Sequence, residues 1–225
     1  MLKIRFKKLR LWMAYPIFLV YPFVARITDL SYLLGACLMF LGLGIRFWAS
    51  GHISKSRHLA TSGPYAYTRN PLYVGNLVAG LGIVAISNNI WLILYYLAAF
   101  SVLYIGTIRE EEESLEEKFA GAYRDYVRAV PAFLPSFKKY PNAEKKPFDL
   151  NQSFKNGEFI RLSGFIVLII FIYLLQSFVV KREPLSKHNA CALLLFMVFL
   201  SLLWFNIIIR RKSERSERSE RRRQA

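Results

Sequence analysis

The chain has 225 residues, of which 54% are hydrophobic and 20% are charged, and its formal net charge at pH 7 is +16. The hydrophobic residues gather in long charge-free blocks, which excludes an ordinary water-soluble domain and indicates an integral membrane protein. The positive charge does not indicate a nucleic-acid partner, because the basic residues cluster beside these blocks and at the chain ends.

Charge-free apolar blocks predict the membrane crossings. The blocks are residues 11–25, 30–45, 70–108, 162–180 and 189–209. The last two are close to the roughly 20 residues that a helix needs to cross a bilayer. The third would form a helix of about 58 Å, too long for one crossing, and Asn88 and Asn89 interrupt it. We therefore predict an all-α, polytopic membrane bundle with a hairpin at this point and about six transmembrane helices, with four or five as alternatives.

The distribution of basic residues predicts the orientation. They cluster before the first block and after the last, so the positive-inside rule places both termini in the cytoplasm. The loops at 46–69 and 107–161 then face the cytoplasm as well. The loop at 181–188 is the single exception to the rule, because it is basic and would lie outside. Arg26 and Arg46 flank the first two blocks and are expected to snorkel toward the membrane surface. A bacterial inner membrane and the endoplasmic reticulum fit this pattern equally.

Composition also divides the chain along its length. Residues 1–137 hold every dense polar motif and are expected to form the functional core. Residues 138–159 are rich in lysine, with proline, asparagine and glycine, and are predicted to be a surface linker. Residues 160–210 are expected to add two transmembrane helices whose default role is packing. Residues 211–225 repeat Ser-Glu-Arg and are predicted to be a disordered basic tail or a solvated helix end near anionic lipid.

Gly63 and Pro64 mark a turn within the stretch at 56–75. Asn70 and Pro71 then open a helix, with the asparagine as its cap and the proline at its first position. Backbone donors at such a helix start face the cytoplasmic loop and favour an anionic ligand group. The stretch is therefore a candidate ligand site at the membrane surface.

A second polar segment, at 109–135, begins as a helix that carries four consecutive glutamates. The acids suit either a solvated helix end or a functional site, and a new helix starting near Arg109 would place them at the favourable end of its dipole. Pro131 and Pro135 are expected to end the helix. Apolar residues spaced by three and four predict one stripe that lies against the membrane face. The stripe is Leu115, Phe119, Tyr123 and Tyr126.

Together, the polar motifs between residues 35 and 137 resemble a known family. The motifs are Gly63-Pro64-Tyr65, Arg69-Asn70-Pro71-Leu72-Tyr73-Val74-Gly75, Glu111-Glu112 with the stripe above, and Val130-Pro131 with Pro135. Their spacing across a helical hairpin is similar to that of isoprenylcysteine carboxyl methyltransferases and of the wider set that includes phospholipid methyltransferases. The pattern is fairly specific for this superfamily and does not name a substrate.

The resemblance implies a membrane enzyme that uses S-adenosylmethionine to methylate a lipid or a prenylated, isoprenylcysteine-like acceptor entering between membrane helices. It implies catalytic roles for Arg69 and Glu112 and no metal site. The cofactor-binding residues that it implies are Arg57, His58, Leu59, Ala60, Tyr65, Asn70, Pro71, Leu72, Tyr73 and Glu111. Glu111 would take the cofactor ammonium, and Arg69 or the helix start its carboxylate. No strand precedes a G-x-G-x-x-G loop in this sequence, in agreement with a cofactor site without a Rossmann domain.

Three positions depart from the family pattern. Asn70 stands where the family usually has histidine, and an asparagine cannot take a proton near neutral pH. Thr107 stands where the prenylcysteine enzymes hold the substrate carboxylate with an arginine, and Arg109 lies about 200° further around the helix. Ala120 replaces a glycine, a change that we expect to matter little. These departures favour the superfamily over the prenylcysteine substrate.

Two other functions stay open from the sequence. A membrane reductase of the steroid-reductase type has a similar helical layout but uses NADPH, and the intact motif spacing favours the methyltransferase over it. A non-enzymatic membrane protein on a degenerate scaffold is the second alternative, with Asn70 as its main argument. The sequence does not identify the methyl acceptor or the oligomeric state.

Overall fold

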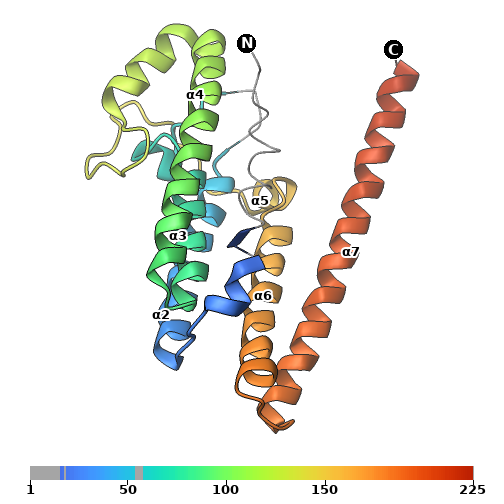
Figure 1. The fold of residues 1–225 in the computed structure, drawn as a ribbon. Coiled ribbons are helices and arrows are strands. Elements are labelled where there is room, and N and C mark those ends of the chain that lie inside the picture. Colours follow the sequence, from blue (N-terminus) through green and yellow to red (C-terminus); the bar gives the residue numbers. More distant parts are fainter. Residues whose placement is uncertain (1–15, 18, 54–57, 225) are drawn as a thin grey trace. The chain divides into compact units, whose positions relative to one another are not determined.

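The computed structural model describes residues 16, 17, 19–53 and 58–224, with side-chain detail as far as residue 208, and every regular element within them is helical (Figure 1). The predicted all-α class is therefore confirmed. The elements are α2 (Asp29–Ser50), the short 3₁₀ turn η1 (Gly63–Ala66), α3 (Pro71–Ile86), α4 (Ile90–Ala129), α5 (Leu150–Lys155), α6 (Glu158–Leu174), the π-helical η2 (Leu175–Val180) and α7 (Lys187–Gln224).

Within the described part of the chain, four helical stretches are long and apolar enough to cross a membrane, which indicates a multi-pass integral membrane protein. They are Asp29–Ser50, Ile90–Ala129, Glu158–Val180 and Lys187–Ile208. The apolar helix α3 is shorter, with 16 residues, and a further helical stretch covers 19–24. The predicted total of six crossings stays a prediction.

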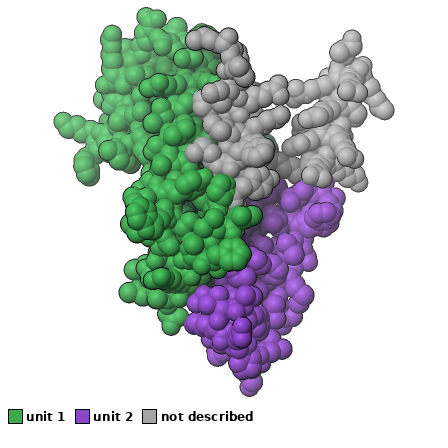
Figure 2. Space-filling model, in the orientation of Figure 1, with its two compact units in different colours: residues 1–156 green, residues 157–225 purple. Residues whose placement is uncertain are grey.

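The chain folds as two compact units, Met1–Asn156 and Gly157–Ala225, which Figure 2 shows in different colours. The boundary falls within the segment 138–159 that composition marks as a linker. That segment is not a loose tether, because Tyr140 N donates to Ala66 O at 2.9 Å and Asn156 Nδ2 donates to Ser50 O at 2.8 Å. The functional meaning of the division stays a prediction.

Glycines bring α2 and α3 into backbone contact. A Cβ atom added at Gly42 would lie 2.2 Å from Ala79 N and 2.6 Å from Gly75 O, and one at Gly82 would lie 2.4 Å from Met39 N. Small residues allow this close approach, which supplies packing in a membrane where the hydrophobic effect between helices is absent. The two helices therefore form a rigid pair.

The hairpin predicted at Asn88 and Asn89 is confirmed. Asn88 adopts a left-handed conformation with φ of 48°, which asparagine tolerates better than most residues. The Asn89 side chain accepts from Trp91 N at 3.0 Å and from Leu92 N at 3.4 Å, so it caps α4. The same side chain donates to Val24 O at 3.1 Å and ties the hairpin to the preceding segment.

Helix α4 passes through Arg109 without a break, so the alternative of a new helix starting there does not hold. The helix has 40 residues, and its backbone leaves helical geometry only at Ala120, where φ is 42° and ψ is −115°. Figure 1 shows the last part of α4 folding back from the rest. The part of α4 before this break would span about 45 Å, longer than the roughly 30 Å of a hydrocarbon layer, so its acidic end is expected to extend beyond that layer.

The apolar stripe of this second half packs on the protein rather than on the membrane face, which corrects the expectation. Its members join a buried cluster with loop residues from both sides of the hairpin, and the helix ends at Ala129, before Pro131, as predicted. Buried members are Ala66, Tyr123, Tyr126, Val130 and Tyr140, and Leu59, Tyr67, Leu115, Phe119 and Ala143 pack around them. The sequence periodicity identified the stripe but not its partner.

The second unit is a helical hairpin whose turn is held by polar side chains. The buried Asn189 accepts from Tyr173 Oη at 3.0 Å and donates to Pro184 O at 3.3 Å. The Ser177 hydroxyl donates to Glu183 in the same turn. Helix α7 then continues to Gln224, through the residues for which the sequence predicts a tail.

Candidate functional site

The two sequence motifs meet where α3 begins beside the middle of α4. The Tyr73 hydroxyl donates to Glu111 Oε1 at 2.6 Å, and Arg69 Nη1 lies 3.2 Å from Glu112 Oε1. The side chains of Arg69 and Glu112 are 13% and 25% exposed, so this ion pair is largely removed from water. The consecutive glutamates therefore face different partners, and both partners belong to the start of α3.

The start of α3 agrees only in part with the sequence prediction. Asn70 occupies the cap position and Pro71 the first helical position, as expected. The Asn70 side chain, however, makes no capping hydrogen bond and instead donates from Nδ2 to Ala132 O at 2.9 Å. Its predicted role as a side-chain cap is wrong, because the chain after α4 supplies a carbonyl within its reach.

The loop before α3 is bound along its length to the chain after α4. Arg69 N donates to Pro131 O at 2.9 Å, and Ser136 N donates to Tyr67 O at 2.8 Å. The Thr68 hydroxyl donates to Phe133 O at 2.9 Å. These bonds hold Arg69 opposite α4 through the backbone, so its guanidinium can meet Glu112 without relying on the ion pair alone.

The remaining predicted cofactor residues lie around this centre with different degrees of involvement. Tyr65 is buried, and its carbonyl accepts from Tyr126 Oη at 2.6 Å. Leu59 packs against the cluster at the end of α4, and Ala60 is half-buried beside it in sequence. His58 is exposed and, among the described residues, makes no hydrogen bond or ion pair. Arg57 lies outside the described residues.

Arg46 is a member of this region that the sequence analysis assigned elsewhere. It was expected to snorkel from the end of α2, but it is only 4% exposed and turns inward. Its Nη1 donates to Leu72 O at 3.1 Å and to Asn76 Oδ1 at 2.6 Å, both on α3. A charge so near an apolar block is costly unless paired, and the polar Asn76 inside the next block was the signal that could have indicated its partner.

His52 is a second buried polar residue that the sequence did not single out. Its Nδ1 lies 3.1 Å from Ser62 Oγ. The ring packs against Gly63 and occupies the space that a Cβ atom would need there, and the φ of 57° at this glycine also disfavours any other residue. Burial, and then the charge of Lys146, lower the pKa of His52 below its usual value, so the imidazole is neutral near pH 7. His52 therefore supports the loop that carries the turn tyrosine.

Unused hydrogen-bonding capacity remains at the centre of the site. Arg69 Nε and Tyr123 Oη are buried polar atoms without a well-formed hydrogen bond among the described residues, although these two side chains are electrostatic neighbours. Such groups cost free energy unless a ligand or water satisfies them. Acids and donors thus lie together, an arrangement that suits a small ligand carrying both an ammonium and a carboxylate group.

The part of the chain that holds this site is similar to a known protein family. Residues 30–122 match the phospholipid methyltransferase family. This part of the chain belongs to that family. The match includes Arg46, Arg69, Tyr73 and the glutamate pair. It leaves out residues 1–29, the end of α4 from Tyr123 onward, the chain after α4 and the whole second unit. The predicted superfamily resemblance is thereby confirmed.

Curated relatives share this segment with the chain. The nickel-cobalt-cadmium resistance protein NccN of Alcaligenes xylosoxydans xylosoxydans is 38% identical over 105 residues, 46% of this chain and 47% of its own. The cobalt-zinc-cadmium resistance protein CzcN of Cupriavidus metallidurans is 36% identical over 110 residues, 48% of this chain and 49% of its own. The protein-S-isoprenylcysteine O-methyltransferase of Xenopus laevis is 34% identical over 132 residues, 53% of this chain and 45% of its own. The chain thus spans about half the length of the relatives that it matches, and no solved structure matches it.

Proposed function

We propose that this phospholipid methyltransferase-family chain transfers a methyl group from S-adenosylmethionine to a membrane-embedded lipid or prenylated acceptor. The observation that carries the proposal is the meeting of the two motifs, through the Tyr73–Glu111 hydrogen bond and the Arg69–Glu112 ion pair. Residues 38 or more positions apart in sequence are joined here at the start of α3. The match to the phospholipid methyltransferase family and the similarity to isoprenylcysteine methyltransferases support the same reaction.

The residues present suit the methyl donor. Glu111 would hold its ammonium group, and Arg69, with buried capacity left at Nε, would hold its carboxylate. The buried Tyr65 and the proline-locked turn from Asn70 to Tyr73 would enclose the rest. When bound, the cofactor supplies an electrophilic methyl group on a good leaving group. We assign to Arg69 and Glu112 the task of fixing the site for in-line attack and excluding water.

Within the predicted stretch from Arg57 to Ala60, the described residues His58, Leu59 and Ala60 would form the outer lip of this cofactor site. Leu59 is anchored in the buried cluster, and His58 is exposed beside it. An exposed imidazole next to an anchored residue can close over a ligand without rearranging the core. This assignment rests on the family resemblance and on the anchored position of Leu59.

The proposed site lies at the cytoplasmic membrane surface, in a chain with six crossings and both termini in the cytoplasm. The support is the positive-inside distribution of charge, together with a hairpin whose turn lies at the opposite end of α3 from the site. Cysteines introduced at Ser136 and Asn88 should be labelled from opposite sides of sealed vesicles. Labelling from the same side would contradict this topology.

Ligand binding to detergent-purified protein tests the function. S-adenosylhomocysteine should bind with a measurable heat in calorimetry, and NADPH should not, because the reductase alternative requires the reverse. Incubation of the protein with membrane lipids, prenyl-thioether analogues and isotope-labelled S-adenosylmethionine, followed by mass spectrometry, should then yield a labelled lipid. Binding of neither cofactor would favour the degenerate-scaffold alternative and overturn the proposal.

A further inference from the structure

A directional hydrogen-bond relay runs from α2 through α3 to α4, inside the membrane-spanning part. An arginine side chain only donates hydrogen bonds, so the contact of Arg46 Nη1 with Asn76 at 2.6 Å fixes the amide oxygen of Asn76 as the acceptor. The amide nitrogen is then turned toward α4, where Asn76 Nδ2 donates to Tyr104 Oη at 3.3 Å. The direction of the relay follows from the first residue, which cannot accept.

This direction leaves the hydroxyl proton of Tyr104 available. The Tyr104 oxygen accepts from Asn76, and no described residue accepts from Tyr104 in return. Tyr96, two turns earlier on α4, is the opposite case. Its hydroxyl donates to Asn76 O at 2.9 Å and Leu77 O at 3.3 Å, so its proton is used within the protein. The Tyr96 hydroxyl proton is thus used in hydrogen bonds within the protein, whereas the Tyr104 hydroxyl proton is available to a ligand.

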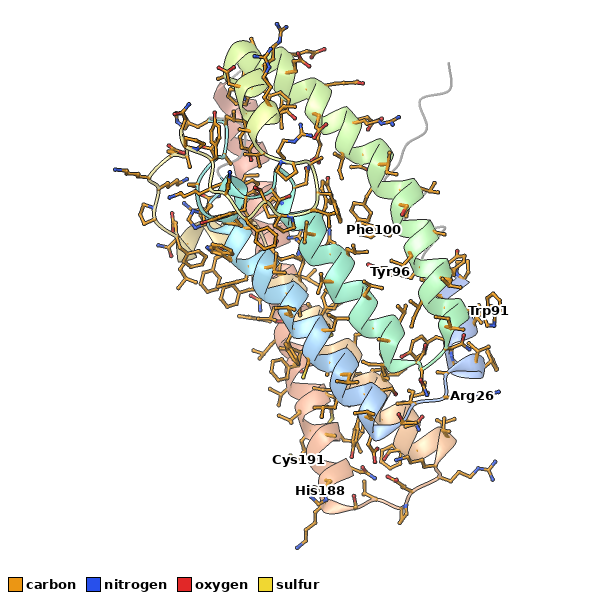
Figure 3. All side chains as sticks on the ribbon, turned by 90° about the vertical axis from the view of Figure 1, so that its left-hand side faces the viewer. Arg26, Trp91, Tyr96, Phe100, His188 and Cys191 are labelled. Carbon is orange, nitrogen blue, oxygen red and sulfur yellow. The ribbon has the colours of Figure 1, made fainter. Side chains whose placement is uncertain are left out.

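The free hydroxyl lies on the same side of α4 as the candidate cofactor site. Tyr104 and Glu111 are separated by seven residues, about two turns, which places them on one face of the helix roughly 10 Å apart along its axis. The Tyr104 ring meets the Tyr73 ring edge to face at 4.9 Å and stacks on Phe100 at 4.0 Å. Figure 3 shows Tyr96 and Phe100 reaching from α4 toward α3.

Neither of the residues that could replace the missing family arginine is placed to do so. Thr107 is committed to its own helix, since its hydroxyl donates to Leu103 O at 2.8 Å. Arg109 is exposed. An acceptor that presents an anionic oxygen to the membrane side of the site therefore meets Tyr104 first.

We infer that Tyr104 donates a hydrogen bond to an anionic oxygen of the lipid acceptor, with Arg46 and Asn76 as positioning residues that set its direction. The inference rests on the proposed function, which supplies the acceptor. The oxygen belongs either to the carboxylate of a prenylated cysteine or to the phosphate of a phospholipid. In this chain the neutral Tyr104 hydroxyl thus takes the place of the arginine guanidinium expected from the family pattern.

The first test compares Tyr104→Phe with Tyr96→Phe, each of which removes one oxygen atom and keeps the ring. Binding of N-acetyl-S-farnesylcysteine and of phosphatidylethanolamine nanodiscs is measured without methyl donor, and S-adenosylhomocysteine binding is measured separately. Tyr104→Phe should weaken one of the two lipid probes by about 10- to 100-fold, and the probe affected identifies the oxygen. It should leave the affinity for S-adenosylhomocysteine within about twofold, since the ring that contacts Tyr73 is kept and Glu111 lies about two turns away. Tyr96→Phe should lower thermal stability and leave both lipid affinities unchanged.

The second test reverses the relay without changing its shape. In Asn76→Asp the carboxylate only accepts, so the Tyr104 hydroxyl donates back to it and is lost to the ligand. Lipid affinity should fall as in Tyr104→Phe, and the double variant should be no weaker than either single one. Any of four results would overturn the inference. They are unchanged lipid affinity in Tyr104→Phe, equal losses of lipid affinity in the two tyrosine variants, additive losses in the double variant, and failure of the wild-type protein to bind either lipid probe. If only S-adenosylhomocysteine failed to bind, the result would contradict the proposed function and not this inference, because the lipid-binding measurement contains no methyl donor.

Discussion

Helix α3 packs against two neighbours in different ways, and the contrast separates support from function. Toward α2 it presents Gly75, Ala79 and Gly82, and the two backbones touch. Toward α4 it presents Tyr73 and Asn76, which reach across to Glu111 and Tyr104. At these glycines the first interface has no space for a Cβ atom. The second is built from polar side chains, which in the proposed function would exchange a protein partner for a ligand.

The contrast shows how a membrane protein of this size can hold a polar site. Burying charged and polar groups among apolar helices is unfavourable unless each finds a partner. The close α2–α3 contact fixes the backbone that carries Arg46 and Asn76, so their hydrogen bond needs little further ordering. The α3–α4 side can then keep donors and acids in an open arrangement. In the proposed function, the rigid α2–α3 contact would support the ligand site between α3 and α4.

The largest expected effect comes from breaking the glycine interface. Gly42→Leu should prevent folding or destabilise the protein by more than about 3 kcal/mol, because the new side chain meets the α3 backbone, which cannot move aside. Gly44→Leu is the matched control on the same helix, since nothing lies within 4 Å of its Cβ position. Thermal melting and size-exclusion chromatography in detergent measure both. Similar melting temperatures for the two variants would refute the close packing of α2 and α3.

The next effect concerns the acids that face α3. Glu111→Gln should weaken S-adenosylhomocysteine binding about 10- to 150-fold, the range expected for losing a charge-assisted hydrogen bond of about 1.5–3 kcal/mol. Glu113→Gln is the control, because Glu113 is exposed and makes no ion pair or hydrogen bond among the described side chains. Calorimetry gives both affinities. Equal losses would mean that the acidic run acts only as bulk charge.

A smaller effect is expected at Asn70, where the family usually has histidine. Asn70→Ala removes the hydrogen bond to Ala132 O and should cost about 1 kcal/mol of stability together with some turnover. Asn70→His should keep turnover within a few-fold, because we expect this side chain to orient the site rather than to take a proton. Methylation rates between pH 5.5 and 8.5 check this. A large gain in Asn70→His, with a new pH dependence near 6–7, would identify the ancestral histidine as a base.

The smallest effect has the opposite sign. Ala120 adopts φ of 42° and ψ of −115°, a conformation that glycine tolerates and alanine does not. Ala120→Gly should therefore raise stability, by at most about 1 kcal/mol, which would run against the expectation from sequence that this departure matters little. Ala122→Gly, at an ordinary helical position on the same exposed turn, should lower stability by about 1 kcal/mol. Thermal melting of the two variants measures these changes. A loss of stability in both would show that the chain is not strained at Ala120.

Much of the architecture could be read from the sequence because the physics involved is local. Apolar block length predicts the membrane helices, and the Asn88-Asn89 pair predicts the hairpin that joins α3 to α4. The motif spacing also predicted that Arg69 and Tyr73 belong with the glutamate pair, and the structure brings these four side chains together. The resemblance to a family supplied that grouping, since composition alone left each signal weak.

The partners of individual side chains depended on the tertiary structure, because they come from segments far apart in the chain. The Asn70 side chain turned from its own helix to Ala132, and Arg46 turned from the membrane surface to Asn76. The apolar stripe of α4 packs against loop residues instead of lipid, because the break at Ala120 folds this part of the helix back. A sequence pattern states which groups need partners. Only the packed backbone decides which partners lie within the roughly 3 Å that a hydrogen bond requires.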